Sequence, residues 1–122
     1  KSLAGKYVYI DVWDTCCAPC IQQRPDLKRV EVRYEGKNIA FVSLSRDKLA
    51  EKTKWRDMIK ERQLGGIQLF GESDWNSKFV KDFDITGIPR FILIDPQGNI
   101  VDADAPRPSD PRLIALFDSL KL

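Results

Sequence analysis

The hydrophobic positions along the chain fall into short runs typical of buried strands, separated by segments with helical spacing. Residues 7–13 (YVYIDVW) are rich in β-branched and aromatic side chains and apolar on both faces, which predicts a strand in the middle of a sheet. Asp11 is the polar exception within this strand. Residues 38–45 predict a second central strand, and residues 67–70 predict a short third one.

Helices are predicted in the segments between these strands. A helical stretch should run from the cysteine-containing segment to about Tyr34, with Pro25 producing a kink in it. A second helix is expected over 48–63, ended by the glycine pair at 65–66, and a third from about 74 to 83.

The last third of the chain predicts a hairpin and a closing helix. Two strands, 90–94 and 100–103, are joined by turn-forming residues at 95–99, which indicates an antiparallel pair. A cap and a proline at 109–111 then open a helix with apolar residues at core spacing. This order of elements predicts an α/β fold with a mixed central sheet and helices on both faces.

Composition and charge narrow the class of protein. A chain of 122 residues with 43% hydrophobic and 31% charged residues fits a single globular domain, without the run of about 20 apolar residues that a membrane span needs. The net charge of +2, with acids and bases interleaved, makes nucleic acid an unexpected partner. Four basic residues at helical spacing would line one face of a helix, and we interpret this face as solvated and not as a nucleic-acid site. They are Arg24, Lys28, Arg29 and Arg33.

The cysteine pattern restricts the chemistry further. Cys16, Cys17 and Cys20 lie close together, and the chain contains no histidine. A structural zinc site needs about four Cys or His ligands, so no metal is expected unless a carboxylate or a second chain contributes. A disulfide-stapled scaffold would spread an even number of cysteines along the chain. The lack of histidine also excludes a cysteine hydrolase whose thiol is paired with an imidazole.

The segment Cys17-Ala18-Pro19-Cys20 follows a predicted strand and opens a predicted helix. At this spacing, two cysteines in a first helical turn lie close enough for a disulfide. A helix amino terminus favours a thiolate, which lowers a thiol pKa from about 8.5 toward about 7 or below. We therefore predict Cys17 as the attacking thiol and Cys20, one turn deeper, as the resolving thiol.

At this point the sequence resembles the thioredoxin superfamily, in particular the TlpA-like thiol-disulfide oxidoreductases of bacterial envelopes. The resemblance extends from YVYIDVW through CAPC, Pro25, TGIPRFILID and PQGNIV to the last helix. It implies a thioredoxin-like fold in which the helix and strand between Ser45 and Asp74 form a TlpA-like insertion that adds an edge strand. It also implies a periplasmic location. Because residues 1–122 begin almost at the first core strand, we expect the C-terminal domain of a longer precursor.

The resemblance implies roles for single residues. Asp11, six residues before Cys17, matches a buried carboxylate that exchanges a proton with the resolving thiol, here Cys20. Burial would raise the pKa of this carboxyl. Pro89 matches the cis-proline opposite the cysteine pair, which leaves the backbone of Ile88 to pair with an extended substrate.

The remaining expectations concern residues around the cysteine pair. Ala18 and Pro19 between the cysteines are expected to contact substrate. Arg107 belongs to a loop beside the cis-proline and could approach Cys17, with an ordinary exposed arginine as the alternative. Cys16 occupies the position where the family commonly has tryptophan, and we expect a small apolar filler there, with a regulatory thiol as the alternative.

The predicted function is thiol-disulfide exchange with protein or peptide substrates through a mixed disulfide on Cys17, without a cofactor. A redox partner is also expected, and the domain is expected to be monomeric and not membrane-spanning. One alternative is a peroxiredoxin-like thiol peroxidase, although that chemistry favours a Thr-x-x-Cys context and a distant resolving cysteine. Another is a non-catalytic binding module that uses the cis-proline groove. The direction of electron flow does not follow from the sequence.

Overall fold

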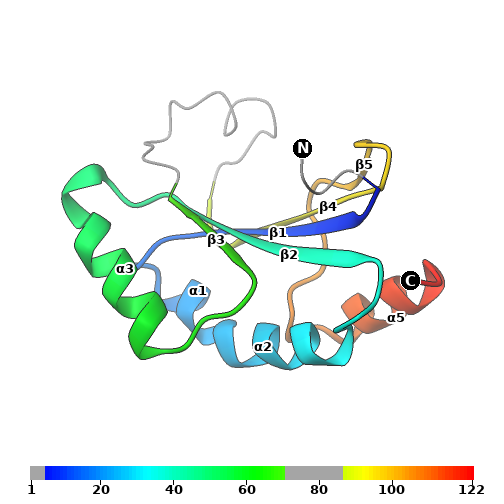
Figure 1. The fold of residues 1–122 in the computed structure, drawn as a ribbon, viewed down its shortest axis with the longest axis horizontal. Helices are drawn as coiled ribbons and strands as arrows, with labels where there is room; N and C mark the ends of the chain where they lie inside the picture. Colours follow the sequence, from blue (N-terminus) through cyan, green and yellow to red (C-terminus); the bar gives the residue numbers. More distant parts are fainter. Residues whose placement is uncertain (1–4, 71–86) are drawn as a thin grey trace.

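The computed structural model describes residues 5–70 and 87–122, and the helix predicted from about 74 to 83 lies outside these ranges (Figure 1). The strands are β1 (Tyr7–Trp13), β2 (Ile39–Ser45), β3 (Ile67–Phe70), β4 (Arg90–Ile94) and β5 (Ile100–Asp102). The helices are α1 (Ala18–Gln22), α2 (Arg24–Arg33), the 3₁₀ helix η1 (Leu49–Glu51), α3 (Lys52–Glu61) and α5 (Pro111–Ser119).

The described strands form one mixed sheet in the order β3-β2-β1-β4-β5. β2 runs parallel to both β1 and β3, whereas β4 is antiparallel to β1 and β5. β1 is therefore the central strand, which agrees with its apolar residues on both faces. β3 lies at one edge, as expected for the inserted strand, and the hairpin of β4 and β5 forms the other edge.

The main core lies between the sheet and helices α2 and α5, which lie on the same side of it (Figure 1). The ring of Tyr9 stacks on that of Phe91 with centroids 5.6 Å apart, and Phe117 of α5 meets Tyr9 edge-on at 5.4 Å. Val12 and Ile92 point to the opposite face and are fully buried there. Because side chains alternate along a strand, Asp11 faces α2 together with Tyr9.

The stretch predicted as one kinked helix forms two separate helices, α1 and α2. α1 ends before Gln23, which acts as C-cap of α1 and N-cap of α2. Pro25 lies in the first turn of α2, where a backbone N–H would have no partner within the helix. The proline position was predicted correctly, and its consequence is two helices.

The end of α3 differs from the prediction that glycines 65–66 terminate this helix. Gln63 adopts a left-handed backbone with φ of 51°. Its amide donates to the carbonyl of Lys60, and the amide of Leu64 donates to that of Ile59, which is the hydrogen-bond pattern of a Schellman cap. These bonds satisfy carbonyls at the helix end, so the helix stops before the glycine pair is reached.

Candidate active site

Cys17 and Cys20 form a disulfide at the start of α1, with their Cα atoms 5.2 Å apart. Cys17 is the N-cap of α1, and its Sγ accepts a hydrogen bond from the amide of Cys20 at 3.2 Å. The side chain of Cys17 is half-buried, whereas Cys20 is only 2% exposed. The two sulfurs therefore differ in access, and Cys17 is the one that solvent reaches.

Asp47, which follows β2, holds the loop that leads to the cysteine pair. Its buried carboxylate accepts hydrogen bonds from the Thr15 amide at 3.0 Å, the Thr15 hydroxyl at 2.8 Å and the Ser45 hydroxyl at 2.6 Å. A buried carboxylate is tolerated when hydrogen bonds compensate its lost hydration. The predicted site did not include Asp47, although an acid two residues after the end of a buried strand is a signal that could have suggested it.

Asp11 lies on the face of β1 that points toward α2 and forms a buried ion pair with Arg24. The Oδ2 atom of Asp11 is 2.6 Å from Nη2 of Arg24, and the two residues are 3% and 7% exposed. Arg24 also donates to the hydroxyl of Ser43 at 3.1 Å, and its guanidinium lies 4.2 Å from the ring centre of Trp13. The prediction that Arg24 belongs to a solvated helix face is therefore wrong.

The spacing of the helix residues contains a signal for the burial of Arg24. Leu27 and Val30 of α2 are buried, and Arg24 precedes Leu27 by three residues, so it belongs to the same helix face. The number of basic residues on the helix does not indicate that Arg24 shares a face with Leu27 and Val30. The side chain can remain buried because Asp11 supplies an opposite charge from a different element.

The electrostatic environment of Asp11 agrees with the expected effect of burial. Burial raises the pKa of the Asp11 carboxyl above its usual range. The Arg24 guanidinium and the Ser43 hydroxyl act in the opposite direction without cancelling this effect. A carboxyl with a raised pKa can take up and release a proton at a higher pH than an exposed one.

The Ile88–Pro89 peptide bond is cis and lies directly before β4. Pro89 and Arg107 both line a groove beside β4 and the segment that leads to α5, and the residues lining this groove do not include Cys17. The segment that leads to α5 is joined to the end of α1, because the side-chain Nε2 of Gln23 donates a hydrogen bond to the Ser109 hydroxyl at 3.0 Å. The structure thus brings Arg107 to the proline.

The predicted substrate-contact residues differ in exposure. Ala18 and Pro19 are exposed on α1, next to the disulfide. Ile88 is half-buried and follows the exposed Gly87.

Cys16 is a free, exposed thiol and not the apolar filler that we expected. Its Sγ lies 3.4 Å from Nζ of Lys54 and 3.7 Å from Oε2 of Glu51. These charged side chains belong to η1 and α3, the segment that the resemblance identifies as an insertion. Burial in an apolar core therefore does not explain why a cysteine occupies position 16. A regulatory role for its thiol stays a prediction.

Residues 5–70 and 87–122 contain no group of three or more His, Cys, Asp or Glu side chains arranged to hold a metal ion. Within the same ranges, no helix has both the length and the apolar character to cross a membrane.

Comparison with known proteins identifies the family. A thioredoxin-like family model matches residues 5–100. This chain belongs to the thioredoxin-like family. The thioredoxin-like chain is 26% identical over 102 residues to the thiol-disulfide oxidoreductase ResA of Bacillus cereus, a match that covers 84% of the chain and 56% of ResA. It therefore spans about half the length of this curated relative.

Solved structures give the same assignment. The thioredoxin-like chain superposes on a proposed thiol-disulfide oxidoreductase of Bacteroides vulgatus with a TM-score of 0.87 and 48% identity, covering 98% of this chain and 76% of the other. It superposes on a thiol-disulfide oxidoreductase of Bacteroides fragilis with a TM-score of 0.83 and 25% identity, covering 96% and 82%. The predicted thioredoxin-like fold is confirmed.

Proposed function

We propose that this thioredoxin-like chain is a thiol-disulfide oxidoreductase that exchanges the Cys17–Cys20 pair with protein substrates. The observation that carries the proposal is the unequal access of two bonded cysteines, of which Cys17 is half-buried and Cys20 is buried. A substrate sulfur can form a bond with Cys17, while Cys20 is held one helical turn away to break that bond. The names of the relatives support the same chemistry.

In the reducing direction, the Cys17 thiolate attacks one sulfur of a substrate disulfide, and the other substrate sulfur leaves as a thiolate. The Cys20 thiolate then attacks Sγ of Cys17 in the mixed disulfide. The Cys17–Cys20 disulfide forms, and the second substrate sulfur leaves. Two electrons pass from the cysteine pair to the substrate, and the reverse sequence oxidises a substrate dithiol.

The surrounding residues support both halves of this exchange. Asp11, whose pKa is raised by burial, is proposed to accept the proton that Cys20 loses before it attacks. The Ile88 backbone, beside the cis bond to Pro89, is proposed to pair with an extended substrate.

The flanking residues and the location complete the proposal. Ala18, Pro19 and Arg107 are proposed to flank the bound peptide. We propose the periplasm of the bacterial cell envelope as the place where this exchange occurs.

Reduction of insulin by dithiothreitol in the presence of the chain tests the proposal. The wild-type chain should accelerate insulin precipitation, and Cys17→Ser should abolish the acceleration because no exposed redox sulfur remains in the pair. An inactive wild type, or a fully active Cys17→Ser variant, would contradict the proposed function. Rapid consumption of hydrogen peroxide without insulin reduction would favour the peroxidase alternative.

A further inference from the structure

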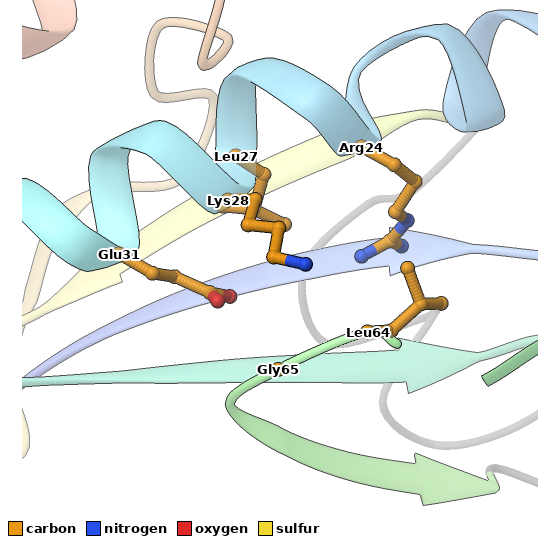
Figure 2. A pocket seen from close by; sticks show the side chains of 6 residues that line it. All are labelled: Arg24, Leu27, Lys28, Glu31, Leu64 and Gly65. Atoms are coloured by element: carbon orange, nitrogen blue, oxygen red, sulfur yellow. The ribbon is translucent and has the colours of Figure 1, made fainter. Parts of the chain in front are cut away.

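A small pocket lies between α2 and the turn that precedes β3 (Figure 2). Its lining residues are Arg24, Leu27, Lys28, Glu31, Leu64 and Gly65. The side chains of Arg24 and Glu31 lie two helical turns apart on α2 and extend toward the pocket from its two ends (Figure 2). The Asp11–Arg24 ion pair therefore borders a space that a second carboxylate also reaches.

Two glycines allow the turn to approach the carboxylate of Glu31 closely. A Cβ atom on Gly65 would lie 2.7 Å from Oε1 of Glu31, and one on Gly66 would lie 3.2 Å from Oε2 and 2.8 Å from the carbonyl oxygen of Phe41. Gly66 also has a φ of +70°, which side-chain-bearing residues rarely adopt. Glu31 is half-buried as a result, on the same helix as the buried Arg24.

The buried ion pair creates an electrostatic difficulty for proton exchange at Asp11. A guanidinium stays protonated in proteins, so Arg24 keeps its positive charge when Asp11 takes up a proton. A buried charge that loses its counterion is strongly destabilising. If Asp11 is to accept the proton of Cys20, another negative group must compensate Arg24 during that step.

We propose that Glu31 is this second counterion, so that Glu31 and Arg24 are positioning residues for the resolving step. This inference rests on the proposed function. The Cys20 thiol gives its proton to Asp11, the Cys20 thiolate attacks Sγ of Cys17, and the substrate leaves as a thiolate that takes a proton from solvent. Glu31 remains ionised across the pocket while Asp11 is neutral. Asp11 then returns its proton to solvent, and the original ion pair is restored.

The charged groups around the two carboxylates are consistent with this arrangement. Arg24 and Lys28 on α2 and Asp11 on β1 act on Glu31, while residues 64–66, which pack against it, carry no titratable side chain. Burial raises the pKa of Glu31, the charge of Asp11 raises it further, and the two basic residues lower it. Asp11 itself faces Arg24 from α2 and the Ser43 hydroxyl from β2.

The test is a carbon-detected NMR titration of the Asp11 carboxyl in the reduced 122-residue chain. The negative charge of Glu31 disfavours ionisation of Asp11, so Glu31→Gln should lower the titration midpoint of Asp11 by about half a pH unit. A weaker base accepts a proton less readily, so release of substrate from the mixed disulfide should slow by about threefold near neutral pH.

Two further variants separate charge from structure. Glu35→Gln removes the same charge from an exposed position and should leave the Asp11 midpoint unchanged. Glu31→Asp keeps the charge and should return the midpoint toward the wild-type value. An Asp11 midpoint that does not move in Glu31→Gln, or moves equally in Glu35→Gln, overturns the inference. The titration does not require turnover, so it decides the inference even if the wild-type chain fails to reduce insulin and the proposed function is wrong.

Discussion

The Nη2 atom of Arg24 lies 2.6 Å from Oδ2 of Asp11, in a place that water barely reaches. Asp11 belongs to the central strand, and Arg24 is the first residue of α2. The pair therefore joins the helix that follows the cysteine pair to the middle of the sheet. Trp13, under the guanidinium, completes the contact from the same strand.

Replacement of Arg24 by Met should destabilise the chain strongly. The change leaves the buried Asp11 carboxylate without its cation, and loss of one partner of a buried pair costs about 3–5 kcal/mol. Urea unfolding measures the loss, and the exposed Arg29→Met is the matched control, expected within about 1 kcal/mol of wild type. The double variant Asp11→Leu/Arg24→Met should recover much of the stability. Equal effects of Arg24→Met and Arg29→Met would show that the buried pair is unimportant.

The stability of Arg24→Met should also depend on pH. Arg24 lowers the pKa of Asp11, so its removal moves that pKa further above the unfolded value of about 3.9. A group with a raised folded pKa stabilises below its unfolded pKa, and this contribution is lost as pH rises through the folded value. The deficit relative to wild type should therefore grow as the pH rises above the unfolded pKa of about 3.9 and through the raised folded-state pKa of Asp11. A deficit that shrinks over this interval would contradict the prediction.

Replacement of Cys20 by Ser should trap substrates. Cys17 can still attack, but no thiol remains to break the mixed disulfide. Adducts sensitive to reductant should then appear on non-reducing gels with Cys20→Ser and be absent with Cys17→Ser. The opposite result would reverse the roles of the two cysteines.

Asp11→Asn should slow product release more than the initial attack, because an amide cannot accept the proton of Cys20. The slowing should shrink as the pH rises, because a thiol loses its proton more readily at higher pH and then depends less on an internal base. Stopped-flow measurement of both steps over a pH series tests this, with the exposed Asp57→Asn as control. Identical release rates in wild type and Asp11→Asn at every pH would eliminate the proton-exchange role.

Asp47→Ala should destabilise the chain by about 3 kcal/mol, because the amide and hydroxyl of Thr15 and the hydroxyl of Ser45 lose a charged acceptor. The exposed Asp57→Ala should change the free energy of unfolding by no more than about 0.5 kcal/mol. Urea unfolding compares the two variants. A loss for Asp47→Ala as small as that for Asp57→Ala would mean that solvent replaces these hydrogen bonds.

Patterns along the chain were sufficient for much of the fold. β1 and β4 have the predicted bounds, and the hairpin, the edge strand and the cap of α5 are where the sequence indicates them. These features depend on side-chain periodicity and on residues close in sequence, such as Asp110 at the start of α5. The spacing of Cys17 and Cys20 likewise predicts their disulfide, because one helical turn sets their separation.

Tertiary structure decided which charged residues are buried. In the sequence, Arg24 belongs to a basic helix face, and only the fold places Asp11 of β1 beside it. In the same way, Asp47 is an ordinary acid after a strand in the sequence, and only the fold places the amide of Thr15 against it. Cys16 in turn lies beside Lys54 only because α3 packs near the cysteine loop. A buried charge is stable only with a partner. Arg24 finds Asp11 and Asp47 finds Thr15 in a different part of the fold, at a distance along the chain that periodicity does not report.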